Sequence, residues 1–181
     1  MKEDSLKFRA MTIEDTDKIV KWRNREFVRK NFIYQEPFTR QEHLSWIETQ
    51  VNTGRVVQFI ISLPEGREIG SVYLRDIDRK EGHAEFGIFI GEPDAVNHGY
   101  GTEATNWVLS YAFEELKLQK VFLRVLSDNL RARKSYEHAG FQMIEGEEET
   151  VTLLDGKHQV IFPVGEEVAT EIVIYILDHI R

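Results

Sequence analysis

The feature of this sequence that most constrains its fold is a glycine-rich turn between a strand pattern and a helix pattern. The strand pattern covers residues 84–90, and after a polar break the chain reads Asn97-His98-Gly99-Tyr100-Gly101. Beyond the turn, apolar residues recur every three or four positions from Ala104 to Leu116, which is typical of an amphipathic helix. A helix N-terminus offers free backbone N–H groups, and glycines let such a backbone approach a pyrophosphate closely. The turn therefore suggests an anion-binding site, although a plain structural turn explains these residues somewhat better when they are taken alone.

Two other phosphate-binding motifs do not fit this turn. No Gly-Lys-Ser/Thr follows the glycines, so the turn is not a Walker A motif. The third glycine of the dinucleotide fingerprint is also missing, and the strands before the turn are joined as hairpins rather than as βαβ units.

The first half of the chain predicts a strand, two helices and a meander of strands. Residues 6–11 alternate as a strand does, and Thr12 to Asp15 has the form of a capping box before the first helix. Pro37 separates that helix from a second helix over residues 40–51. Short polar turns then join three antiparallel strands over residues 56–63, 68–74 and 84–90.

The second half predicts a strand–helix–strand crossover. An apolar strand over residues 121–126 precedes a short helix that Asn129 caps and Gly140 ends. Further strands begin at Phe141 and cover residues 171–177, with a hairpin turn at 154–157 and a surface loop at 163–169. This order of elements predicts a mixed α/β fold in a single domain over residues 1–181.

Composition narrows the chemistry that such a domain can perform. The chain has no cysteine, which excludes disulfides, thiolate metal sites and a cysteine nucleophile. Its six histidines are scattered, so we expect no metal site. A net charge of −8 argues against a nucleic-acid partner. The acidic run at residues 145–149 is most simply a solvated edge, and a weaker interpretation is that net acidity favours amine-bearing substrates.

No targeting or membrane segment is expected from the sequence. The charged start Met1 to Ser5 is not followed by an apolar run, as a signal peptide would require. No stretch approaches the roughly 18 apolar residues of a membrane span. We therefore expect a cytoplasmic protein that does not act at a membrane.

Two blocks of the sequence resemble the GNAT acetyltransferases. Residues 85–90, followed by Gly99-Tyr100-Gly101-Thr102-Glu103-Ala104, look like the central strand and acetyl-CoA loop of that family. Asn129 to Phe141 is similar to its Asn…Tyr-Glu-x-x-Gly-Phe segment, in the right order and at the usual separation. Val96 departs from the family pattern, in which Arg or Gln often stands there, and this should cost affinity rather than change the ligand. The resemblance covers nearly the whole chain and implies a mostly antiparallel, twisted sheet of six or seven strands with about four helices.

The resemblance also implies the residues that bind acetyl-CoA. The backbone of Phe89 and Ile90 would pair with the pantetheine arm like an added strand. Asn129 would hydrogen-bond the cofactor, and Tyr136 would lie near its sulfur, although taken alone these two residues suit a helix cap and core packing. The pyrophosphate would be bound by Val96, Asn97, His98, Gly99, Tyr100, Gly101 and Thr102.

Acetyl transfer to an amine needs a polarised thioester, a base and an acid. Because the chain has no cysteine, we expect the amine to attack directly in a ternary complex. A backbone N–H within residues 88–90 is the candidate for polarising the carbonyl, and Tyr136 is the candidate general acid. Glu85 is the candidate base through a water, yet an ion pair or solvated side chain explains it somewhat better. His83 and Glu92 are lesser candidates, and an amine of low pKa needs no dedicated base.

Candidate acceptor-binding residues follow the first strand. Trp22, Arg23, Asn24 and Arg29 lie in a segment that resembles a GNAT subgroup acting on nucleotide-linked amino sugars and on ribosomal-protein N-termini. The segment around His43 and Trp46 also resembles the amino-sugar enzymes. The tryptophans suit helix anchors just as well, whereas Arg23 and Asn24 suit a substrate phosphate or hydroxyl.

These observations leave several functions open. The leading hypothesis is an N-acetyltransferase acting on a small amine such as a nucleotide-linked amino sugar. A protein N-terminus and a polyamine are alternative acceptors. A different class is a non-catalytic acyl-CoA-binding regulator, and a third is a structural interaction module. The long C-terminal hairpin is consistent with a homodimer.

Overall fold

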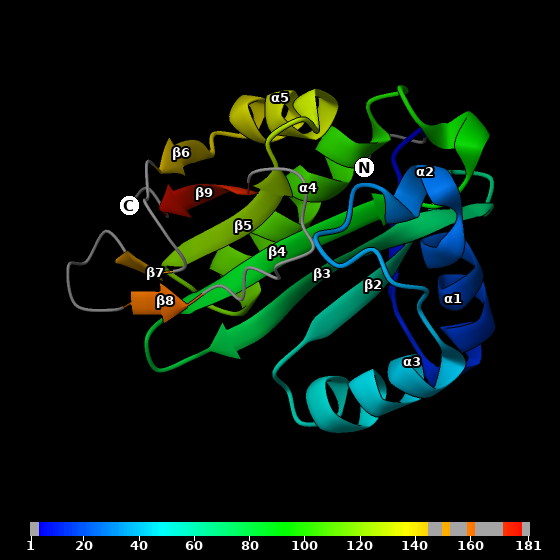
Figure 1. Cartoon of the computed structure of the whole chain (residues 1–181), viewed down its shortest axis with the longest axis horizontal. Coiled ribbons are helices and arrows are strands. Elements are labelled where there is room, and N and C mark those ends of the chain that lie inside the picture. Colours follow the sequence, from blue (N-terminus) through cyan, green and yellow to red (C-terminus); the bar gives the residue numbers. More distant parts are fainter. Residues whose placement is uncertain (1–3, 145–149, 153–158, 162–171, 179–181) are drawn as a thin grey trace.

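The computed structural model describes residues 4–144, 150–152, 159–161 and 172–178, and it is built on a seven-stranded sheet (Figure 1). The strand order is β1-β2-β3-β4-β5-β9-β6, which confirms the mixed α/β fold. The strands are β1 (Lys7–Ala10), β2 (Val57–Ser62), β3 (Glu68–Asp78), β4 (His83–Ile90), β5 (Lys120–Leu126), β6 (Gln142–Ile144) and β9 (Ile172–Asp178).

A separate two-stranded sheet lies in the C-terminal part of the chain. Its strands β7 (Thr150–Thr152) and β8 (Gln159–Ile161) pair antiparallel. The predicted hairpin turn at 154–157, the predicted loop at 163–169 and the acidic run at 145–149 lie outside the described residues.

The helices match the predicted ranges closely, except for a short helix over residues 26–29 that was not predicted. They are α1 (Thr16–Asn24), α2 (Glu26–Arg29), α3 (Arg40–Trp46), α4 (Tyr100–Ser110) and α5 (Leu130–His138). The π-helical turns η2 (Ile47–Val51) and η4 (Tyr111–Glu115) extend α3 and α4, and η1 (Ile13–Asp15) and η3 (Pro93–Ala95) are 3-10 turns. Within the described part of the chain, no helix is both long and apolar enough to cross a bilayer.

One strand pair differs from the rest of the main sheet. All its other pairs are antiparallel, but β4 and β5 run parallel, as the predicted crossover requires. Their pairing covers only His83 to Glu85 against Lys120 to Phe122. Beyond this point β4 continues to Ile90 and β5 to Leu126 without pairing to each other. The two strands therefore part in the middle of the sheet.

The two faces of the sheet bury different sets of helices. One core cluster joins Phe86 of β4 to Ala104 and Val108 of α4. The other joins Phe89 of β4 to Ile19 and Trp22 of α1. Because successive side chains of a strand point to opposite faces, β4 contributes to both cores. Figure 1 shows α1, α2 and α3 grouped together, away from α5 and β6.

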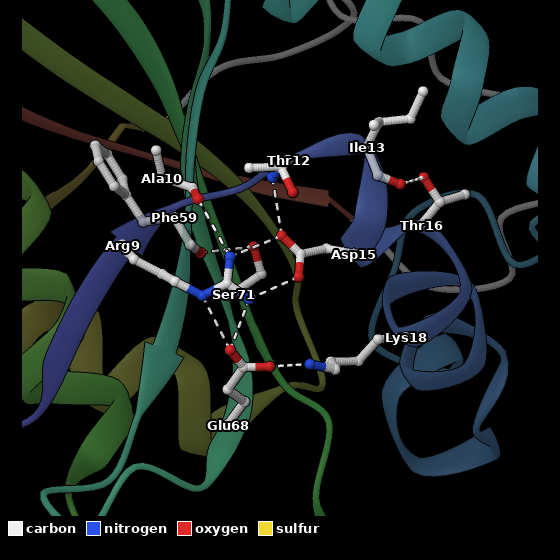
Figure 2. Close-up of polar contacts among 10 residues, drawn as sticks. All are labelled: Arg9, Ala10, Thr12, Ile13, Asp15, Thr16, Lys18, Phe59, Glu68 and Ser71. Carbon is white, nitrogen blue, oxygen red and sulfur yellow. Dashed lines mark hydrogen bonds and ion pairs between the residues drawn. The ribbon is translucent and has the colours of Figure 1, made fainter.

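A polar network fixes the start of α1 against the sheet (Figure 2). Arg9 of β1 makes two hydrogen bonds to the Asp15 carboxylate, of 2.6 and 2.9 Å, and the same carboxylate accepts the backbone N–H of Thr12 at 2.8 Å. Glu68 of β3 accepts from Arg9 at 2.6 Å and pairs with Lys18 of α1. The network sets the position of α1, and therefore of Arg23 near its end.

Candidate active site

A cavity of about 530 Å³ follows the line along which β4 and β5 part. At one end it is lined by the glycine-rich turn and by α5, including Gly101 and Tyr136. At the other end it is lined by residues of α1 and α3 and of the segment between α2 and α3, including Arg23, Phe32 and His43. One continuous space thus joins the predicted cofactor loop to the predicted acceptor helices.

The register of β4 shows which backbone groups face this space. Gly91 donates its N–H to Ile69 at 2.7 Å, and residues 85, 87 and 89 stand in the same alternating position against β3. The backbone groups of Ile88 and Ile90 therefore point toward β5, which does not pair with them. Of the two residues Phe89 and Ile90 named from the sequence, Ile90 offers its backbone to the gap. Phe89 lines the cavity, and its backbone faces Ser71 of β3.

The glycine-rich turn has the geometry that an anion site requires. Asn97 and Gly99 have φ angles of 64° and 81°, and Gly99 is the N-cap of α4. A Cβ added at Gly101 would meet no protein atom within 4 Å, so the space before the helix N-terminus is open. Thr102 is fixed by a 2.9 Å hydrogen bond between its hydroxyl and that of Ser135 on α5. These features fit a pyrophosphate bound by backbone N–H groups.

Nine of the ten predicted cofactor residues line the cavity. The exception is His98, which is exposed and stacks on Tyr100 with 5.5 Å between ring centres. The nine are Phe89, Ile90, Val96, Asn97, Gly99, Tyr100, Gly101, Thr102 and Asn129.

Asn129 and Tyr136 reach the cavity from α5. The Asn129 side chain accepts a hydrogen bond from the backbone N–H of Ala132 at 3.4 Å, which confirms its predicted cap. Tyr136 packs edge-on against Phe86, with 5.6 Å between ring centres, and burial raises the pKa of its phenol. A protonated hydroxyl beside the gap is suited to donate a proton.

Glu85 lies at the last residue pair before the strands part, and its carboxylate is held by arginines. Arg124 of β5 donates to it from Nε at 2.7 Å, and Arg75 of β3 forms a second ion pair at 3.8 Å. The Glu85 side chain is only 8% exposed. Of the two interpretations of Glu85 that the sequence left open, an ion pair is the simpler one. Both oxygens of the Glu85 carboxylate already have arginine partners.

The four predicted acceptor-binding residues have different environments. Trp22 is buried and donates from Nε1 to Glu92 at 2.8 Å, and Asn24 makes two 2.7 Å hydrogen bonds with the Phe38 backbone. Neither these two nor Arg29, which lies partly exposed on α2, lines the cavity. Arg23 does line it.

Several cavity residues were not anticipated from the sequence. Tyr73 and Arg75 lie opposite Gly87 and Glu85 in the β3–β4 register, and a Cβ at Gly87 would come within 2.3 Å of the Tyr73 ring. Arg124 interrupts an otherwise apolar strand, which is a usable signal for a buried, paired charge. Among the described residues, no group of three or more His, Asp or Glu side chains could hold a metal ion.

The parted strands, the cavity and the open helix N-terminus are the arrangement expected of an acetyl-CoA-dependent N-acetyltransferase, and the family comparison shows this class of protein. The chain belongs to the GNAT acetyltransferase family, because the family's domain model matches residues 5–142.

Two proteins illustrate the similarity of this chain to others in sequence. An uncharacterised protein of Methanocaldococcus jannaschii is 31% identical over 145 residues, which cover 77% of this chain but only 29% of that longer protein. Spermidine N(1)-acetyltransferase of Escherichia coli K12 is 28% identical over 144 residues, which cover 79% of this chain and 75% of the relative.

Solved structures agree on the fold. Spermidine N-acetyltransferase from Vibrio cholerae, in complex with CoA and spermine, superposes with a TM-score of 0.79 at 22% identity, over 96% of this chain and 95% of that one. A dodecameric structure of the same enzyme has a TM-score of 0.71 at 22% identity, over 96% and 94%. At this identity the likeness shows the fold alone.

Proposed function

We propose that this protein transfers the acetyl group of acetyl-CoA to a small primary amine by direct attack in a ternary complex. The observation that carries the proposal is the single cavity that joins the glycine-rich turn to the α1–α3 end. Both substrates fit along one path, and the junction lies where the backbone groups of Ile88 and Ile90 have no strand partner in β5.

Binding and catalytic roles can then be proposed for the residues along the cavity. The N–H groups around Gly99 to Thr102 bind the pyrophosphate, and Asn129 contacts the cofactor while capping α5. The Ile88 or Ile90 N–H polarises the thioester carbonyl. Tyr136 protonates the departing thiolate. Glu85 holds Arg124 and Arg75 in place at the point where the strands part, and a low-pKa amine loses its proton to water.

A polyamine is the second candidate acceptor. The observation in its favour is that E. coli and V. cholerae spermidine acetyltransferases resemble this chain in sequence or fold. A nucleotide-linked amino sugar remains the acceptor that the Arg23 segment favours.

An amine panel tests the proposal against the non-catalytic alternative. Free CoA is measured after acetyl-CoA is mixed with the protein and spermidine, a peptide, an amino sugar or its UDP-linked form. Release of CoA with one of these amines supports an enzyme. Tight binding of acetyl-CoA without release by any amine favours a regulator, and no binding at all removes the cofactor assignment.

The assembly and the location of the protein are part of the same proposal. Because a similar enzyme forms dodecamers, we propose a homo-oligomer, of which the homodimer expected from the sequence is the smallest form. A cytoplasmic location stays a prediction of the sequence.

A further inference from the structure

Arg23 is the cation of the α1–α3 end of the cavity that has no acidic partner among the described residues. Its guanidinium carbon lies 4.3 Å from the ring centre of Phe32 and 3.9 Å from that of Phe38. Its Nε is buried and makes no hydrogen bond within the part of the chain that the structure describes. A guanidinium keeps its charge in a protein, and a buried charged donor without a partner is unfavourable. The position is stabilised when an anionic group of a ligand meets it.

The other charged groups at this end of the cavity already have polar partners within the protein. Arg75 and Arg124 share the Glu85 carboxylate. Glu42 accepts the backbone N–H of Thr39 at 2.7 Å as part of the cap of α3. Neither Glu85 nor Glu42 forms an ion pair with Arg23, and burial lowers the pKa of the Arg23 guanidinium although the charge of Glu42 partly opposes this effect.

His43 complements Arg23 as a hydrogen-bond acceptor. The Thr16 hydroxyl donates its one proton to the Ile13 carbonyl at 2.7 Å, as Figure 2 shows. The 3.0 Å contact between Thr16 Oγ1 and His43 Nδ1 must then be donated by the ring. Burial and the charge of Arg23 lower the pKa of His43 to about 4, so the ring is neutral at pH 7 and Nε2 carries a lone pair. That Nε2 is buried and has no partner among the described residues.

These two groups lie beside each other. Both contact the ring of Phe38, His43 edge-on at 6.0 Å between ring centres and Arg23 over its face. Both line the same end of the cavity. A cationic donor and a neutral acceptor thus contact the same aromatic ring at this end of the cavity.

We propose that the acceptor carries an anionic oxygen, of a carboxylate or a phosphate, which Arg23 binds while His43 Nε2 accepts an N–H or O–H of the same molecule. The inference rests on the proposed function, since it names the substrate class for the same cavity. Arg23 is a bidentate donor for either oxyanion. A polycation such as spermidine would meet an unmatched positive charge at this point.

Two matched pairs of amines test this, with binding measured by calorimetry on the CoA complex so that no turnover is needed. Glycine against glycinamide isolates the carboxylate, and glucosamine 6-phosphate against glucosamine isolates the phosphate. In one pair the amine that carries the anionic group should bind roughly tenfold tighter than the amine that lacks it. Arg23→Met should reduce that ratio to about one, and Arg23→Lys should keep part of it.

The control and the second variant separate recognition from folding. Arg67→Met removes a surface cation that pairs with Asp94 outside the cavity, and it should keep the full ratio. His43→Asn keeps a donor toward Thr16 but removes Nε2, so it should weaken both members of a pair equally.

Equal binding within both pairs, or tighter binding of spermidine than of either anionic amine, overturns the inference. The panel of amines separates its failure from that of the proposed function. CoA release with spermidine but with no anionic amine leaves an acetyltransferase whose acceptor we have assigned wrongly. If the protein binds CoA but no amine in the panel releases CoA from acetyl-CoA, a charge preference that Arg23→Met abolishes still supports the acceptor site, while the proposed enzyme activity fails.

Discussion

At the scale of single residues, local backbone geometry shapes the turn before α4 and the start of α5, whereas pairing between distant strands places the buried charges beside them. Gly99, Gly101 and Asn129 are set by local backbone requirements, a left-handed N-cap, an open approach and a helix cap, which leave a mark in the sequence. The partnership of Glu85 with Arg124 depends on strands 39 residues apart meeting in one register, and no local pattern encodes it. For the same reason Trp22 and Asn24 could not be told from cavity residues before their partners were known.

Tyr136→Phe tests the general acid. The variant removes only the hydroxyl, so turnover should fall by about 10²-fold or more while the KM for acetyl-CoA changes little. Tyr111→Phe is the matched control, because Tyr111 packs on Trp107 outside the cavity. Since burial raises the pKa of Tyr136, turnover should show no loss from this group up to about pH 10. Equal turnover in Tyr136→Phe and wild type would remove the acid from the mechanism.

Glu85→Met tests whether this residue is a base or a buried ion-pair partner. Removing one partner leaves the Arg124 charge buried, which should lower the free energy of unfolding by roughly 3–5 kcal/mol. Adding Arg124→Met should recover most of that loss in urea denaturation. If the single variant is as stable as wild type yet inactive, Glu85 acts in the chemistry instead.

His43 should make the stability of the protein depend on pH. Its folded pKa of about 4 lies below the value near 6.5 of an unfolded histidine, so the unfolded chain binds the extra proton between these values. The free energy of unfolding should therefore decrease as the pH falls through that window, by up to roughly 3 kcal/mol. His43→Asn should flatten this slope, whereas His98→Gln, at an exposed position, should keep it. Urea midpoints at pH 4.5 and 7 measure the difference.

At the scale of elements, the helices, the meander and the crossover followed from periodicity, but the parting of β4 and β5 did not. Strand patterns show that two segments form strands, and a helix between them indicates a parallel pair. How far that pairing extends depends on packing on both faces of the sheet, with Phe86 in one core and Phe89 in the other. The separation of β4 from β5 makes room for the pantetheine arm of the proposed cofactor.

Gly101→Leu tests the cradle at the start of α4. A Cβ here meets no protein atom within 4 Å, and leucine is a better helix former than glycine, so the melting temperature should not fall. The new side chain would fill the space before the helix N-terminus, so we expect acetyl-CoA to bind at least about tenfold more weakly in calorimetry. Asn106→Leu, exposed on the same helix and outside the cavity, should bind as wild type does. Unchanged affinity in Gly101→Leu would place the pyrophosphate elsewhere.

At the scale of the whole molecule, direct acetyl transfer requires both substrates to occupy the cavity together. The sheet separates two helical layers, and the gap between β4 and β5 connects the cofactor end with the acceptor end. The sequence contains no cysteine, so no cysteinyl group can hold the acetyl group between two half-reactions.

Initial velocities with acetyl-CoA and the accepted amine both varied test this claim most directly. Direct transfer predicts double-reciprocal lines that intersect, because the acetyl group passes only within a ternary complex. Parallel lines would contradict it, since they indicate an acetylated enzyme that forms before the amine binds.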